Sequence, residues 1–260
     1  MFIYMAQHDF LIKAKTVLQT EIDELIRLKD RLGQEFVDAV EVLRTGLESG
    51  GKLIVIGIGK SENIATKIAA TLSSTGAPSV VLSCQNALHG DLGVVSPGDL
   101  VLALSYSGET AELLDLLPHL KRRPVTIIAF TGKKDSTLAA SSDIILDIEV
   151  QTEACPLNLA PTSSTTNMLA LGDALAMVLL QSRGFQSEDY AKLHPGGSLG
   201  RQLLTRVTDI MRKGEQLALV ADQGLLRQRH RAFRQRTALP DARQGEAGGL
   251  VSRFLPAGGE

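Results

Sequence analysis

Apolar residues recur at helical spacing along residues 7–48, and polar residues fill the opposite side of the predicted helix. Such a stripe is typical of a helix that packs along one side. We therefore expect an N-terminal helical arm over residues 1–48 that packs on the body of the protein or on a partner chain. The positions that form the stripe are Leu11, Ala14, Leu18, Ile22, Leu25, Ile26, Leu32, Phe36, Val40 and Leu43.

From Lys52 the pattern changes to short apolar runs that alternate with amphipathic segments. The runs are continuous, which indicates strands covered on both faces. Repeated strand–helix units predict a parallel sheet with right-handed crossovers. The predicted strands cover residues 53–56, 79–82, 100–104, 125–130 and 144–148, and the predicted helices cover 61–72, 109–121 and 136–140.

The C-terminal part of the chain loses this rhythm. Residues 162–183 form a long, mostly apolar pattern, with Pro161 before it and Gly184 after it, which predicts a helix. A short helix is expected at 187–191. Lysine is absent after Lys213, so that arginine supplies the basic charge of the tail. The tail is either a basic helix over 225–236 that binds an acidic partner or a poorly ordered extension, and we favour the extension.

A cluster of hydroxyl groups lies where a predicted strand turns into a helix, in the sequence Ser-Tyr-Ser-Gly-Glu-Thr at 105–110. The first turn of a helix presents unpaired N–H groups and a partial positive charge, and glycine lets a ligand approach the backbone. The segment therefore predicts a phosphate site and a phosphorylated small molecule as ligand. The alternative is that Ser105 or Ser107 only caps the helix.

A second glycine turn, Gly-Ile-Gly-Lys-Ser at 57–61, follows the first predicted strand. It ends like a P-loop, but Ile54 stands where that motif needs its first glycine. It also resembles a dinucleotide fingerprint, but Glu62 replaces the last glycine. Neither nucleotide motif is complete, so the turn is interpreted as a glycine bend that exposes Lys60 at a strand end, next to the phosphate segment.

Composition narrows the class of protein. The chain has 260 residues, a net charge of −2, 44% hydrophobic and 22% charged residues. This balance favours a folded globular protein and gives no sign of nucleic-acid binding. Cys84 and Cys155 form no CxxC pair, which fits a reducing compartment. No apolar run reaches about 18 residues, and residues 1–10 lack a signal-peptide core. We expect a cytoplasmic protein without membrane contact.

Taken together, the motifs resemble a sugar isomerase (SIS) domain, and within that class the arabinose-5-phosphate isomerase family. The serine segment is general to such domains, whereas Glu-Ala-Cys-Pro at 153–156 and His-Pro-Gly-Gly at 194–197 are more specific. The resemblance covers about residues 10–214. The segments that carry it are 57–61, 74–76, 89–93, 105–110, 153–157, 159–166, 172–176 and 194–201.

The resemblance implies an α/β fold: a three-layer sandwich around a five-stranded parallel sheet. It implies three regions, namely the arm at 1–48, the SIS domain at 49–205, and a linker and divergent tail at 206–260. The implied reaction is the interconversion of D-ribulose 5-phosphate and D-arabinose 5-phosphate through an enediolate. The product would supply synthesis of 3-deoxy-D-manno-octulosonate (KDO), the eight-carbon acid sugar of lipopolysaccharide or capsule.

The resemblance also implies site residues, and the four catalytic positions among them keep the residue type of the family. Isomerisation needs a base, an acid and positive charge or donors for the enediolate. The four catalytic positions are Lys60, Glu112, Glu153 and His194. The expected roles are proton transfer for His194 or Glu153, oxyanion stabilisation for Lys60, and orientation for Glu112. The expected substrate contacts are Gly59, Ser61, Gly76, Ala77, His89, Ser105, Ser107 and Thr110.

Three positions depart from the family pattern. Ser83 replaces a histidine that many relatives use for metal, so no metal and no cofactor is expected. Ala77 replaces a common threonine. The residues after Gly214 do not show the pattern of the two cystathionine-β-synthase (CBS) repeats that longer relatives carry, so no complete CBS module is expected.

The resemblance further implies a homodimer or homotetramer, in which His194 acts across an interface. Two other functions stay open. One is a regulatory protein that senses a sugar phosphate without catalysis, and the other is an isomerase of another sugar phosphate. The retained ionisable groups argue against the sensor.

Overall fold

A computed structural model of the chain describes residues 7–197, 200–201 and 207–211. The chain divides into two compact units, Met1–Leu204 and Thr205–Glu260. In the second unit the described part contains one short helix, α10 (Val207–Ile210). The expected tail at 206–260, with its arginine-rich segment, otherwise lies outside the described residues.

The first unit is built on a parallel sheet of five strands, in the order β2-β1-β3-β4-β5. All four neighbouring pairs are parallel. β1, β3 and most of β4 are buried residue after residue, as continuous apolar runs predict. The strands are β1 (Leu53–Gly57), β2 (Ser79–Val81), β3 (Leu100–Leu104), β4 (Thr126–Thr131) and β5 (Ile144–Asp147).

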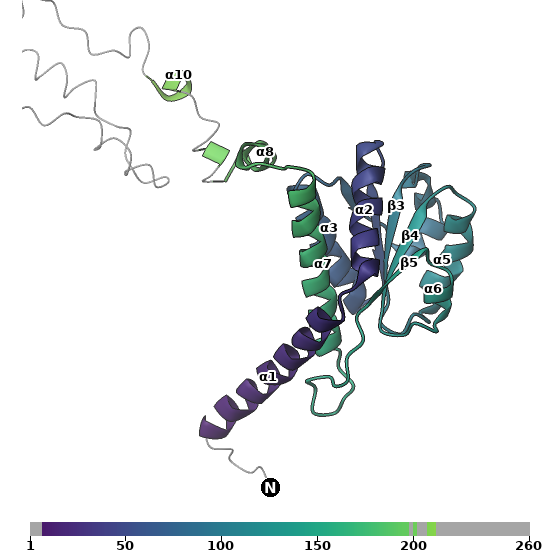
Figure 1. The fold of residues 1–260 in the computed structure, drawn as a ribbon, viewed down its shortest axis with the longest axis vertical. Coiled ribbons are helices and arrows are strands. Elements are labelled where there is room, and N and C mark those ends of the chain that lie inside the picture. Colours follow the sequence, from purple (N-terminus) through teal and green to yellow (C-terminus); the bar gives the residue numbers. More distant parts are fainter. Residues whose placement is uncertain (1–6, 198–199, 202–206, 212–260) are drawn as a thin grey trace, which may run out of the picture. The chain divides into compact units, whose positions relative to one another are not determined.

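Helices cover both faces of this sheet (Figure 1). One face packs against α1 (Gln7–Arg31), α2 (Gln34–Glu48), α3 (Lys60–Ser74) and α7 (Ser163–Ser182). The other face packs against α4 (Cys84–Leu88), α5 (Ala111–Lys121) and α6 (Thr137–Ala140). The predicted three-layer α/β sandwich is confirmed.

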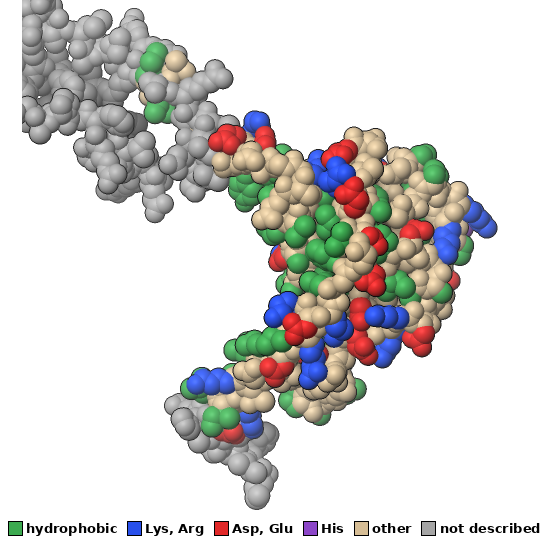
Figure 2. Space-filling model, in the orientation of Figure 1, with side chains coloured by type: hydrophobic (Ala, Val, Ile, Leu, Met, Phe, Trp, Pro, Cys, Tyr) green, Lys and Arg blue, Asp and Glu red, His purple; other side chains and the backbone are tan. Residues whose placement is uncertain are grey.

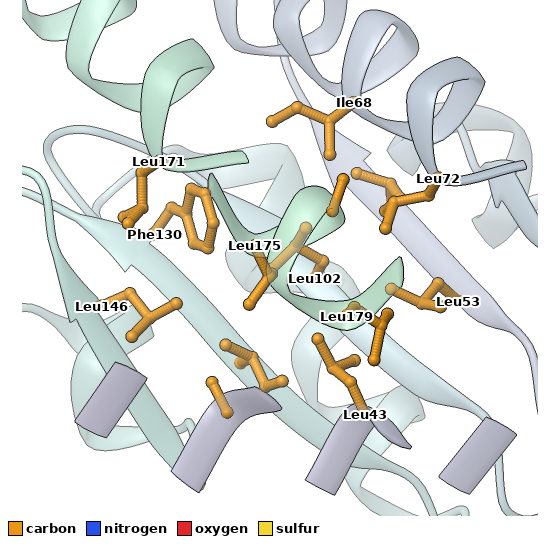
Figure 3. Packing of buried hydrophobic residues seen from close by; sticks show 14 of the residues in the cluster. Leu43, Leu53, Ile68, Leu72, Leu102, Phe130, Leu146, Leu171, Leu175 and Leu179 are labelled. Atoms are coloured by element: carbon orange, nitrogen blue, oxygen red, sulfur yellow. The ribbon is translucent and has the colours of Figure 1, made fainter. Parts of the chain in front are cut away.

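Successive residues of β1, β3 and β4 supply the two cores in alternation, because side chains point to opposite faces of a sheet. On β3, Leu102 belongs to the core beneath α7, while Val101 belongs to the core beneath α5. Figure 3 shows the first of these cores, where Leu175 and Leu179 of α7 lie among side chains of the strands and of α3.

The predicted N-terminal arm is two helices rather than one. Leu32 and Gly33 are not helical, and Gly33 adopts an extended conformation with φ −132° and ψ −155°. The break separates two kinds of surface. α2 buries Ala39, Val40, Leu43 and Leu47, whereas most apolar side chains of α1 before Leu28 stay exposed or half-buried.

Among the described helices, α7 is the one that has the length and apolar composition to cross a membrane, and half of its most apolar window is buried. It packs against α1, α2 and α3, and Leu171, Leu175 and Leu179 are each at most 1% exposed. These contacts are those of a core helix.

Two short elements between β2 and β3 escaped the sequence patterns. They are α4 and the 3₁₀ helix η1 (Asp91–Val94), both too short to show a period. The helix that follows α7, α8 (Ser187–Leu193), extends two residues beyond its prediction. The five strands and the helices α3, α5, α6 and α7 begin and end within two residues of their predicted bounds.

Candidate active site

The strand order reverses between β1 and β3, which creates the position where parallel sheets bind ligands. From β1 the chain adds β2 toward one edge of the sheet, and from β3 it adds β4 and β5 toward the other edge. Gly57, the last residue of β1, pairs in register with Leu104, the last residue of β3. The two glycine-bearing turns therefore leave the sheet side by side at its carboxyl edge, where doubly wound folds place their ligands.

The turn after β1 brings Lys60 to this edge. Gly59 has φ +61° and ψ −117°, a conformation that glycine adopts without strain. Lys60 is exposed and opens α3, and Ser61 follows in the first turn. Among the described residues, the ammonium of Lys60 has no hydrogen bond or ion pair, so its charge is free for a ligand.

The turn after β3 is braced from within by Ser105, which is 3% exposed. Its hydroxyl lies 2.9 Å from the Thr110 hydroxyl and accepts the N–H of Gly108 at 3.1 Å. Gly108 has φ +66°, and a Cβ there would lie 2.0 Å from the Ser136 hydroxyl. The turn is thus a fixed cradle that only glycine fits at this position.

The cap that begins α5 is Thr110, so the alternative that Ser105 or Ser107 caps this helix is wrong. The Thr110 side chain makes no capping hydrogen bond, which leaves the first N–H groups of α5 available to a ligand. Ser107 is exposed, and its hydroxyl accepts the N–H of Glu109 at 3.2 Å. The side chain of Glu109 turns away and accepts the N–H of Thr137 at 2.6 Å.

Glu112 lies in the first turn of α5 and is exposed. Its helix α5 packs against α4, which carries the buried thiol of Cys84. Burial, together with the nearby carboxylates of Glu62 and Glu112, raises the pKa of Cys84 to about 11. The carboxylates of Glu62, in the first turn of α3, and of Glu112 thus both act electrostatically on this thiol.

Glu153 lies in the loop between β5 and α7 and closes the start of α7. Its Oε2 accepts the N–H of Thr162 at 2.7 Å, the hydroxyl of Thr162 at 2.9 Å and the N–H of Ser164 at 3.3 Å. Partial burial opposes ionisation of this carboxyl, but the hydrogen bonds from Ser164 and Thr162 outweigh it and lower its pKa. Glu153 is consequently an ionised, oriented carboxylate.

The starts of α3 and α7 lie at the same end of the sandwich. A Cβ on Gly172 would meet Ile68 at 2.3 Å, and Arg183 donates to the carbonyl of Gly76. Since both contacts pair residues that lie similarly far along their helices, α3 and α7 run parallel and adjacent (Figure 1). This arrangement brings Glu153, at the start of α7, to the end of α3 that carries Lys60.

The structure does not bring all the expected site residues together within one chain. Gly76 and Ala77 follow the far end of α3, which has 15 residues and so separates them from Lys60 by about 20 Å. Ala77 is 2% exposed, and its N–H is bonded to the carbonyl of Leu72. His194 follows α8, beyond the far end of α7, where its ring stacks on Tyr190 with centroids 3.9 Å apart.

His89 lies at the carboxyl edge, where it ends α4 with its side chain exposed. Ser83, which stands where many relatives are expected to have a metal-binding histidine, caps the start of α4. Within the described ranges no three His, Cys, Asp or Glu side chains are grouped as a metal site would need.

Sequence reasoning missed two residues that shape this edge. The buried carboxylate of Glu24 in α1 accepts backbone N–H groups of the loop before Glu153. The phenol of Tyr106 bonds to the same loop at Val150. A charged residue one helical turn before the buried Leu28 is the only signal that could have drawn attention to Glu24.

Several known proteins are similar to this chain in sequence or in fold. An arabinose 5-phosphate isomerase KdsD from Pseudomonas aeruginosa is 50% identical over 212 residues, which cover 82% of this chain and 64% of that protein. An arabinose 5-phosphate isomerase GutQ from Salmonella typhi is 47% identical over 82% of this chain and 65% of its own length. The chain thus spans about two thirds of the length of these curated relatives.

Among solved structures, the protein c3406 from E. coli CFT073, solved as a complex, is 40% identical, with a TM-score of 0.70. The match covers 74% of this chain and all of that one. A phosphoheptose isomerase GmhA from Neisseria gonorrhoeae, 19% identical with a TM-score of 0.55 over 65% of this chain and 98% of its own, shares the fold. The SIS domain family matches residues 46–178, which span the sheet and most of α7. The chain belongs to the SIS domain family.

Proposed function

We propose that this protein is an aldose–ketose isomerase that interconverts D-ribulose 5-phosphate and D-arabinose 5-phosphate. The observation that carries the proposal is the pairing of Gly57 with Leu104. This pairing places the turn with Lys60 beside the turn at 105–110, here called the serine cradle, where the strand order reverses. The names of the relatives at 47–50% identity support the choice of substrate.

The serine cradle would hold the phosphate. Ser107 and Thr110 offer hydroxyls, and the first turn of α5 offers N–H groups and the positive end of its dipole. Ser105 keeps the turn in shape from beneath. Gly59, Ser61 and His89 lie at the same edge and would contact the sugar.

In the open-chain ketose the reaction removes a proton from C1, beside the C2 carbonyl, to give an enediolate, and then returns a proton to C2, so that the carbonyl ends at C1. We assign proton transfer to Glu153 and His194, with Lys60 stabilising the negative charge that develops on the enediolate oxygen. Glu112 would orient the sugar hydroxyls. Glu153 suits this work because its hydrogen bonds to Thr162 fix one oxygen and leave the other for substrate.

We propose that the complete site forms between copies of this chain, as a homodimer or homotetramer. Two observations support this. His194, Gly76 and Ala77 lie at the opposite end of α3 and α7 from Lys60. The projecting helix α1 also exposes apolar side chains among charged ones, visible in Figure 2. The exposed apolar side chains of α1 are Phe10, Leu11, Ile12, Leu18, Ile22 and Ile26.

We further propose a cytoplasmic location, without metal, cofactor, nucleic acid or membrane, and a product that supplies KDO synthesis. The two free cysteines fit a reducing compartment. The supply of KDO rests on the family resemblance alone.

The direct test is to incubate the purified protein with ribulose 5-phosphate in D2O and follow arabinose 5-phosphate by NMR. We expect product that carries deuterium at C2, because the abstracted proton exchanges with solvent. Lys60→Met should abolish turnover, whereas Lys67→Met, on the same helix and paired with Asp173, should not. Binding without turnover would favour the sensor, and turnover of another sugar phosphate alone would replace the substrate.

The shared site has its own test. Lys60→Ala and His194→Ala are each expected to be inactive, but subunits exchanged between them should regain activity. In a randomly mixed dimer about a quarter of the sites would contain both native groups. If the mixture stays inactive after verified exchange, His194 does not act across an interface.

A further inference from the structure

The loop that leads to Glu153 is held at four successive residues by side chains from distant parts of the chain. Arg31 Nη2 donates to the carbonyl of Glu149 at 2.6 Å. The phenol of Tyr106 donates to the carbonyl of Val150 at 3.3 Å and accepts its N–H at 3.2 Å. Residues 149–152 belong to neither a strand nor a helix. Their backbone is therefore held by side chains of α1 and of the turn after β3.

The last and most buried of these supports is Glu24 of α1. Its Oε2 accepts the N–H of Gln151 at 3.1 Å, and its Oε1 accepts the N–H of Thr152 at 3.2 Å. Each carboxylate oxygen thus receives one of two consecutive amides, immediately before Glu153. Glu24 is 3% exposed.

Burying this carboxylate is costly unless donors satisfy it. The positive charge of Arg27 stabilises this carboxylate only weakly, because Arg27 Nε lies 3.8 Å from Glu24 Oε1 and the Arg27 side chain is 48% exposed. The two amides are consequently the main partners of the buried charge. Any shift of the loop would leave the carboxylate unsatisfied, so Glu24 sets the loop position sharply.

We propose that Glu24 is a positioning residue for the isomerisation, acting through the backbone of Gln151 and Thr152 to place the carboxylate of Glu153. The proposal rests on the proposed function, in which Glu153 transfers a proton. It gives the N-terminal arm a role in the site, although α1 lies outside the matched SIS residues 46–178.

The test uses Glu24→Gln in the full-length protein, since glutamine keeps the volume but turns an NH2 group toward one of the amides. The matched control is Asp23→Asn, which removes the neighbouring exposed carboxylate, bonded only to Gln19 among the described residues. Two measurements are made on both variants: hydrogen exchange of the loop amides, and kcat and KM for ribulose 5-phosphate per folded molecule.

For Glu24→Gln we expect the amides of Gln151 and Thr152 to exchange at least about 10-fold faster, while those of β4 keep their protection. We expect kcat to fall about 10- to 100-fold, because small misplacements of a reacting group cost this much, with KM changed less than about twofold. Asp23→Asn should match the native protein in every measurement.

Unchanged amide exchange, or faster exchange with native kcat, overturns the proposal. A fall in kcat that disappears when rates are corrected for the folded fraction also overturns it, because the role would then be stability alone. If the native protein turns over no pentose phosphate, the proposed function fails, whereas the amide exchange still decides whether Glu24 holds the loop.

Discussion

Glu153 and Thr162 are joined twice: one carboxylate oxygen accepts both the N–H and the hydroxyl of Thr162, at 2.7 and 2.9 Å. The same hydroxyl accepts the N–H of Ala154 at 2.8 Å. The loop from 153 to 162 is thus closed on itself at the start of α7, with the proposed catalytic carboxylate inside the closure.

Thr162→Val should shift the acid limb of the activity profile to higher pH. The pKa of Glu153 is lowered because hydrogen bonds from Ser164 and Thr162 outweigh its partial burial. Removal of one donor raises that pKa, so protonation of Glu153 begins at a higher pH and inactivates the enzyme there. The measurement is kcat/KM against pH, with the exposed Thr45→Val as control. An acid limb that stays in place would remove Glu153 from the ionisations that control turnover.

Ser107→Ala should weaken binding of the phosphate group. Its exposed hydroxyl is at the rim of the cradle, and a hydrogen bond to a charged group contributes about 1.5–3 kcal/mol. We expect KM for the sugar phosphate and the inhibition constant of inorganic phosphate to rise together, by about 10-fold or more. The control is Ser142→Ala, which lies just after the C-terminal end of α6 and donates its hydroxyl to the carbonyl of Leu138. A change in kcat alone would place Ser107 in the chemistry and not in phosphate binding.

The two cysteines should differ in reactivity. Burial and two nearby carboxylates raise the pKa of Cys84 to about 11, and its side chain is fully buried. Backbone N–H groups of Ala160, Leu159 and Leu157 lower the pKa of Cys155, which is partly exposed. We expect an aromatic disulfide reagent at neutral pH to modify one thiol in the native chain and two in the unfolded chain. Cys155→Ser should abolish the native reaction, and a remaining fast thiol would contradict this assignment.

The fold was predictable because local patterns agree with the global architecture. The continuous apolar runs at Leu53 and Leu100 become strands buried on both faces, and the helices between them follow from ordinary spacing. The break at Gly33 was missed because the apolar stripe continues through it, while one extended residue is enough to turn the chain.

The site was predictable only in part. The position of Lys60 and of the serine cradle follows from strand ends, which a sequence reveals. Glu153 and His194 came only from resemblance, since a loop and a helix end have no period. The contacts of Glu24 with Gln151 and Thr152 span more than 120 residues, and no local pattern encodes such a distant pairing.

Asp99 provides a prediction about stability that is independent of the site. Its carboxylate is 2% exposed, lies 2.6 Å from Lys52 Nζ, and accepts the N–H groups of Lys52 and Ser96. Burial opposes ionisation, but these hydrogen bonds outweigh it and lower the pKa of Asp99. A carboxyl whose pKa is lower in the folded state stabilises the protein above its unfolded pKa, and this stabilisation is lost as pH falls through the folded value.

Asp99→Asn should therefore destabilise the protein by about 2–4 kcal/mol at pH 7, because it removes the charge opposite Lys52 and turns an NH2 group toward backbone donors. The difference from the native protein should begin to shrink below about pH 4, where the carboxyl of the unfolded chain takes up a proton, and should shrink further as pH falls through the lower folded pKa. Urea unfolding at pH 7, 5 and 3 measures this difference, with the exposed Asp38→Asn as control. A difference that is constant over this range would show that the charge of Asp99 does not contribute to folding.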